Sequence, residues 1–233
     1  MSIRYAVYYA PPAAHPLSQL ASQWLGRDAW TGATLARPPI AGLDLDGEAL
    51  DALTAAPRGY GFHATLKAPF ALAEGCSEAD LLAAVARLAT ATAPFDIDLQ
   101  VASLSGFIAL TPRRPSDAMV ALHTACVRDL DALRAPLSEA DLARRRRAPM
   151  TPEQDARMVE FGYPWIFEDF RFHMTLTGRI TDSDRRAQLV AALAAHLAPA
   201  TGLHHVDQIC VFRQDSRDTP MHIIQASPFQ PAS

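Results

Sequence analysis

The order of apolar and polar residues along the chain predicts short strands alternating with amphipathic helices. Apolar and polar side chains alternate over residues 62–67 and again over 172–177, which is the period of a half-buried strand. Over 77–91 the apolar residues instead recur at helical spacing, and Ser77 stands where an N-terminal cap is expected. We therefore expect a protein that mixes both kinds of element.

The two halves of the chain repeat one order of elements. Each half contains a strand with a histidine motif, then a helix, then two paired strands. The expected ranges are 62–67, 77–91, 95–102 and 106–112 in the first half, and 172–177, 181–198, 206–214 and 221–226 in the second. A period of about 110 residues indicates a pseudo-symmetric duplication and not a solenoid.

The remaining segments complete the expected architecture. A strand over 3–10 and helices over 16–25 and 46–55 precede the first motif, and capped helical segments fill the region between the halves. We predict an α+β fold over 1–233, in which two pseudo-twofold lobes enclose a central cleft. Each lobe holds an antiparallel sheet with flanking helices. The expected parts of this single bilobal domain are a first lobe at 1–112, a helical insert at 113–165 and a second lobe at 166–233.

Composition excludes several classes of function. The chain is 49% hydrophobic and 20% charged, as soluble globular proteins are, and its net charge of −4 argues against a general nucleic-acid coat. No apolar run reaches the roughly 18 to 20 residues of a membrane helix, and the start "MSIRYAVYYAPP" is unlike a signal peptide. Three well-separated cysteines without a Cys-x-x-Cys spacing are expected to be buried thiols. We expect a cytoplasmic protein that contacts no membrane and has no obligate protein partner.

The two motif strands share the pentapeptide Phe-His-x-Thr-Leu. One match is expected by chance at a frequency of roughly a few in a thousand, and the chain contains two. Strand alternation places the phenylalanine and leucine on the core side and the polar residues on the opposite face. The polar residues are His63, Thr65 and Lys67 in the first copy, and Arg171, His173, Thr175 and Thr177 in the second. Lys67 is the single lysine of the chain, beside twenty arginines.

Two imidazoles on facing strands suit the cleavage of a phosphodiester. One ring can accept a proton from water while the other donates a proton to the leaving oxygen. The threonine hydroxyls could hold the non-bridging oxygens, and Lys67 or Arg171 could offset the charge gained in the transition state. Such a site needs no metal and no cofactor. Taken one at a time, each histidine could equally be a buried ring satisfied by its neighbours.

The two motifs "FHATL" and "FHMTL", each on a strand of a duplicated α+β unit, resemble the 2H phosphoesterase superfamily. That superfamily includes RNA 2′,3′-cyclic phosphodiesterases and 2′-5′ RNA ligase-like proteins. The longer stretches "GYGFHATLKAPF" and "FEDFRFHMTLTGRI" are similar to the branch encoded among phosphonate-utilisation genes. The resemblance implies that His63, Thr65, His173 and Thr175 occupy the catalytic positions. The helical insert at 113–165 is a departure from the smallest members.

The phosphonate branch implies a small phosphorylated cyclic substrate. Phosphonate breakdown by carbon-phosphorus lyase leaves a phosphoribosyl 1,2-cyclic phosphate, and an enzyme of this superfamily could open that ring. An RNA-terminal 2′,3′-cyclic phosphate is the alternative substrate. A hypothesis of another class is a non-catalytic phosphate or nucleotide sensor that uses the same cleft.

Further residues are candidates for contact with a substrate. Tyr8 and Tyr60 could stack on a sugar or base, although aromatic residues at such positions also serve as core. Arg213 is predicted on a strand near the second motif, while Arg171 could instead pair with a neighbouring acid. The run 144–147 consists of four arginines, which point around the helix so that most are solvated, but one could clamp a second phosphate. The adjacent residues His204 and His205 are expected to face opposite ways, which argues against a shared metal.

Overall fold

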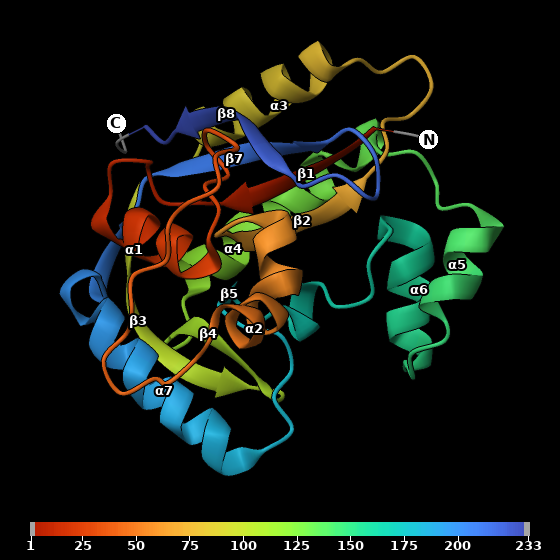
Figure 1. Ribbon diagram of the computed structural model, residues 1–233. Coiled ribbons are helices and arrows are strands. Elements are labelled where there is room, and N and C mark those ends of the chain that lie inside the picture. Colours follow the sequence, from red (N-terminus) through yellow and green to blue (C-terminus); the bar gives the residue numbers. More distant parts are fainter. Residues whose placement is uncertain (1–2, 231–233) are drawn as a thin grey trace.

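The computed structural model describes residues 3–230, which build one eight-stranded sheet covered by helices (Figure 1). The strand order is β6-β3-β4-β5-β2-β1-β7-β8, and every neighbouring pair is antiparallel. The expected α+β fold class is therefore confirmed. Within these residues no helix is long and apolar enough to cross a membrane.

The strands are β1 (Arg4–Tyr9), β2 (Ala64–Phe70), β3 (Phe95–Leu104), β4 (Phe107–Pro112), β5 (Met174–Thr175), β6 (Gly202–Val206), β7 (Gln208–Gln214) and β8 (His222–Pro228). The helices are α1 (Pro16–Leu25), α2 (Gly47–Tyr60), α3 (Glu78–Thr90), α4 (Asp117–Asp129), α5 (Glu139–Arg145), α6 (Pro152–Phe161) and α7 (Ser183–Leu197). Short 3₁₀ turns follow α4, precede β5 and follow α7.

Most expected elements are present. The hairpins β3–β4 and β7–β8 form as predicted, and the caps at Ser77 and Thr151 are complete capping boxes in which side chain and backbone bond reciprocally. The region between the halves is helical, as expected, and contains α4, α5 and α6. Strand β6 was not predicted. The second motif strand is also much shorter than predicted, because β5 has only two residues.

The two spatial halves of the sheet do not follow the two halves of the sequence. Strands β3 and β4 precede the helical insert, yet they lie beside β5, which carries the second motif. Strands β7 and β8 follow the insert and lie beside β1, on the side of the first motif. Figure 1 shows α3 lying across β7 and β8, with α7 across β3 and β4. The segments 1–112 and 166–233 therefore each supply strands to both spatial halves.

Strand β1 contributes side chains to two apolar clusters of different size, one on each side of the sheet. Its residues Tyr5, Val7 and Tyr9 face the main core, which is filled by residues of the helices α1, α3, α4 and α7. The alternate residues Ala6 and Tyr8 face a smaller cluster on the other side of the sheet. This alternation matters for the site, because Tyr8 defines the face on which the first histidine lies.

Candidate active site

The two motif strands are hydrogen-bonded neighbours at the centre of the sheet. Ala64 of β2 pairs with Met174 of β5, and the strands run antiparallel. Continuing this register by one residue in each direction sets the histidine of each motif opposite the threonine of the other. Directly opposed side chains have Cβ atoms about 5 Å apart, and diagonal neighbours about 7 to 8 Å. His63 and His173 each lie one residue before the strand of their motif, and the continued register makes them such a diagonal pair, so the two motifs lie together.

Each histidine is held by a carbonyl two residues before it. The Nδ1 of His63 lies 2.9 Å from the Gly61 carbonyl oxygen, and the Nδ1 of His173 lies 2.7 Å from that of Arg171. Because a carbonyl oxygen can only accept, Nδ1 carries the proton in both rings. In the neutral rings each Nε2 therefore carries the free lone pair. The Thr65 hydroxyl lies 3.4 Å from the Nε2 of His63.

Aromatic rings surround His63, and its burial lowers the pKa of the imidazole. Tyr8 stacks on it with ring centroids 4.0 Å apart, and Tyr60 and Phe212 both lie with their centroids 5.9 Å away. Burial lowers the pKa of His63 to about 4, the bond to Gly61 partly opposes this shift, and the nearby His173 adds to it. His63 is therefore neutral at physiological pH and can accept a proton.

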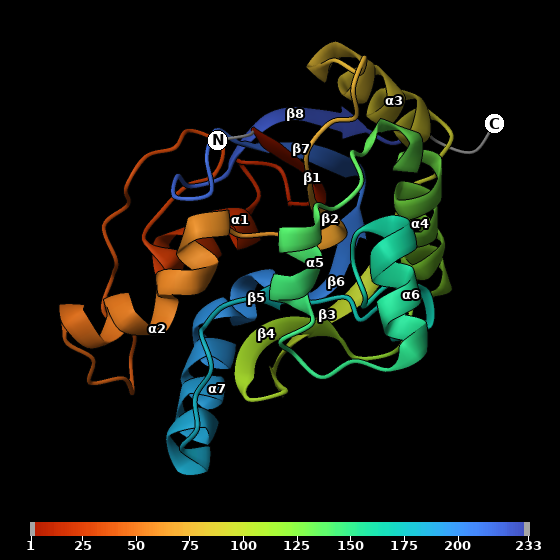
Figure 2. The same cartoon turned by 90° about the vertical axis from the view of Figure 1, so that its right-hand side faces the viewer.

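The motif residues line a continuous depression. His63, Thr65 and Thr175 line a cavity of about 330 Å³, and His173 lines a neighbouring cavity of about 690 Å³. Thr65 and Tyr163 border both cavities, so the two spaces meet at the motif strands. Figure 2 shows α5 in front of β2, with α2 to its left. The cleft is large enough for a small phosphorylated sugar.

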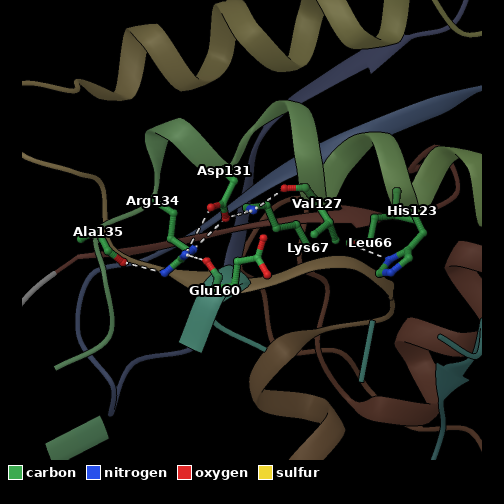
Figure 3. A network of polar contacts seen from close by, with 8 residues as sticks. All are labelled: Leu66, Lys67, His123, Val127, Asp131, Arg134, Ala135 and Glu160. Atoms are coloured by element: carbon green, nitrogen blue, oxygen red, sulfur yellow. Dashed lines mark hydrogen bonds and ion pairs between the residues drawn. The ribbon is translucent and has the colours of Figure 1, made fainter. Parts of the chain in front are cut away.

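Lys67 is not in this cleft. Thr65 pairs with Tyr8, but Lys67 pairs with Val7, so β2 contains an extra residue at a β-bulge. Regular alternation would place Thr65 and Lys67 on the same face of the sheet. Their partners Tyr8 and Val7 face different sides, so the bulge separates the two side chains. The Lys67 side chain points away from the cleft, is 3% exposed, and donates to the Val127 carbonyl at 2.9 Å (Figure 3).

The buried ammonium group of Lys67 belongs to a structural network. It lies 3.1 Å from Asp131, which also accepts from Arg134 at 2.9 Å, and Arg134 reaches the carbonyl groups of Ala135 and Glu160 (Figure 3). Burial lowers the pKa of Lys67, and the Asp131 carboxylate opposes that shift. The expected contact between Lys67 and a phosphate is therefore replaced by a link between β2 and the end of α4.

The other predicted contacts divide into two groups. Tyr8 and Tyr60 border the cavity of His63, and Arg171 borders that of His173. Arg213 lies on the far side of β1 and pairs with Glu78 at 3.1 Å and Asp215 at 2.8 Å, so it is not brought to the cleft. The pair His204 and His205 is likewise separate. His204 meets Tyr9 in the core, whereas His205 bonds Asp96 on the surface.

The cleft contains basic and aromatic residues that the sequence did not indicate. Arg4 of β1 and Tyr163 border the cavity of His63, together with Arg145 from the run 144–147. Arg179 and Trp165 border the cavity of His173. The arginine run was the only one of these that sequence had singled out. The cleft thus offers cations and hydroxyl groups, which are suited to an anion.

Known proteins similar to this chain include two curated relatives. The protein named ribose 1,5-bisphosphate phosphokinase PhnN from Laribacter hongkongensis (strain HLHK9) is 43% identical over 198 residues, which are 83% of this chain and 44% of that protein. A protein of the same name from Janthinobacterium sp. (strain Marseille) is 37% identical over 231 residues, 97% of this chain and 51% of that protein. The chain spans about half the length of these curated relatives.

Solved structures similar to this chain include Escherichia coli LigT complexed with 3′-AMP, at 15% identity and a TM-score of 0.45, with 99% of each chain covered. The protein TT0787 of Thermus thermophilus is 16% identical, with a TM-score of 0.47 and full coverage of both chains. A family model described as "Protein of unknown function (DUF1045)" matches residues 65–222, which include His173 and begin two residues after His63. The match extends over more than half of the chain, and the chain therefore belongs to the DUF1045 family.

Proposed function

We propose that the chain is a phosphoesterase that hydrolyses a small cyclic phosphodiester, with His63 and His173 as base and acid. The observation that carries the proposal is the pairing of the two histidine motifs across β2 and β5 at one cleft. Both Nε2 atoms are left as the reactive atoms, since both Nδ1 atoms donate to carbonyl groups. Acid-base chemistry on a phosphoester needs this arrangement.

The burial of His63 favours the role of base for that ring. Neutral His63 would take a proton from the attacking water through Nε2, and His173, as the acid, would give a proton from its Nε2 to the leaving oxygen of the ring. The P–O bond to water forms as the P–O bond to the sugar breaks, and the ring opens to a phosphomonoester. Thr65 and Thr175 would hold the non-bridging oxygens between the rings. The neighbouring cations are arginines, which suit an anionic substrate and do not bind divalent metals.

The names of the curated relatives support a sugar phosphate as substrate. Both are named for a ribose 1,5-bisphosphate phosphokinase, and this chain spans about half of each. A phosphate-binding loop of the Gly-Lys-Ser/Thr kind is absent here, because the single lysine of the sequence stands between Leu66 and Ala68. We therefore assign phosphoester hydrolysis to this chain, and the phosphokinase activity to the part of the relatives that it does not cover.

The proposal is tested by incubating the protein with cyclic phosphates in the presence of a metal chelator. We expect turnover of a ribose 1,2-cyclic phosphate, measured as release of a phosphomonoester, at a rate that the chelator leaves unchanged. Preference for an RNA 2′,3′-cyclic end would favour the alternative substrate. Binding without turnover of any cyclic phosphate would support the sensor hypothesis and contradict the proposed enzyme.

The low pKa of His63 predicts how the activity depends on pH. A base must be neutral to act, and burial lowers the pKa of His63 to about 4. On the acid side of the profile, measured from pH 3.5 to 7, we expect kcat/KM to decline only as the pH is lowered through about 4. Samples returned to pH 7 should recover full activity, which separates titration from unfolding. An acidic limb centred near 6.5, the ordinary value for histidine, would contradict the role of His63 as the base.

A further inference from the structure

A group of arginines lies beside the histidine cleft, on the side of His63. Arg4 at the start of β1 and Arg145 at the end of α5 line the cavity that contains His63. The same two arginines also line a smaller adjoining cavity of about 60 Å³. The two arginines therefore lie between the cavity of His63 and this smaller cavity. The smaller cavity has room for a compact anion but not for a nucleobase with its sugar.

Arg145 differs from its neighbours in the run because no carboxylate is paired with it among the described residues. Its neighbours in the run are paired, Arg144 with Asp141 at 2.7 Å and Arg146 with Asp155 at 2.7 Å. Within residues 3–230, Arg145 forms no ion pair, and its buried Nε has no hydrogen-bond partner. Arg145 is half-buried, and a guanidinium nitrogen shielded from water without a partner is costly, so the group is expected to bind an anion supplied from outside.

The surrounding charge is positive. Arg4 is held by the neutral side chain of Gln214, at 2.9 Å from its Nε, so its charge also remains available. Arg217 joins the group, and the carboxylate of Asp141 is shared between it and Arg144. Of these four arginines, Arg144 and Arg217 share the carboxylate of Asp141, so the positive charge of the group exceeds the negative. Burial lowers the pKa of both Arg4 and Arg145, and the like charges around them lower it further.

We propose that Arg4 and Arg145 bind a phosphomonoester carried by the same molecule as the cyclic phosphodiester. The substrate class is then a sugar cyclic phosphate with a second, terminal phosphate. This inference rests on the proposed function and specifies its substrate. The arginine fork binds a phosphate through two parallel hydrogen bonds, and Tyr60 and Tyr163 border the space between it and the histidines.

The experiment compares two substrates that differ only in the terminal phosphate. Ribose 1,2-cyclic phosphate, with and without a phosphate on its 5-hydroxyl, is given to the wild type, to Arg145→Ala and to the control Arg147→Ala. Arg147 is exposed, lies in the same run and lines neither of the two cavities. For the phosphorylated substrate we expect Arg145→Ala to lower kcat/KM by roughly 10- to 100-fold, mainly through KM. For the other substrate we expect the change to be less than about twofold.

Equal losses on both substrates, or a wild type that does not prefer the phosphorylated one, would overturn the inference. Arg147→Ala should match the wild type on both. If neither substrate is turned over, the proposed function fails, and binding of ribose 5-phosphate measured by calorimetry still tests the subsite. Binding that Arg145→Ala abolishes and Arg147→Ala retains would support it, and equal or absent binding in all three proteins would refute it.

Discussion

Replacing His63 or His173 with alanine is expected to lower kcat for cyclic phosphate hydrolysis by roughly 10² to 10⁴-fold, as is typical for loss of a general acid or base. In the proposed mechanism the two rings act on one phosphate from just before adjacent strands, so each would be needed in the same step. The double variant should be little slower than either single variant, because groups that act as a unit are not additive. Steady-state kinetics on the purified variants measures both effects.

The matched control is His205→Ala. His205 is an exposed histidine on β6 that bonds Asp96 at 2.7 Å, away from the cleft. Its loss should change kcat by less than about twofold, as for an ordinary surface substitution. Circular dichroism and thermal unfolding would check that all variants remain folded. A loss of tenfold or less in either motif variant would contradict the acid-base roles.

Replacing Asp131 with alanine is expected to lower the free energy of unfolding by about 3 kcal/mol. The substitution leaves the Lys67 ammonium with a single carbonyl partner while its side chain is 3% exposed. Removing the charge itself, as in Lys67→Met, should cost less, because the aliphatic part of the side chain remains packed and no ion is left without its partner. Urea unfolding at pH 7 measures these differences.

The control for this prediction is Asp129→Ala, which removes an exposed carboxylate from the same end of α4. It should alter the free energy of unfolding by less than about 0.5 kcal/mol. In the double variant Asp131→Ala with Lys67→Met, part of the stability should return, since the unpaired charge is gone. Equal destabilisation by Asp131→Ala and Asp129→Ala would show that the Lys67 network contributes nothing.

Local patterns predicted which residues of the first motif face the core, because strand alternation is a local property. The period of two correctly set Phe62 and Leu66 in the core and left His63 and Thr65 at the cleft. The same rule was wrong for Lys67, because a β-bulge in β2 changes the register against β1. Nothing in the motif itself signals the bulge, which depends on pairing with a strand about sixty residues earlier.

The pairing of Arg4 with Arg145 beside the cleft could not be predicted, since the two residues come from distant segments. Arg4 and Arg145 meet only when β1 and α5 are brought to the same side of the cleft. The run 144–147 indicated that one arginine could reach a ligand, but only tertiary packing distinguishes Arg145 from its paired neighbours. The exchange of strands between the halves could not be predicted from sequence either. The local pattern of β3 and β7 is that of a strand and does not specify which strand each one pairs with.

That exchange of strands has a consequence for how the protein is made. Arg4 of β1 and Gln214 of β7 are bonded although they stand 210 positions apart. At a synthesis rate of about 5 to 20 residues per second, β1 waits roughly 10 to 40 s for this neighbour to be translated. Through that interval one long edge of an aromatic strand is open to other chains. The open edge of β1 therefore exposes the nascent protein to aggregation until β7 is made.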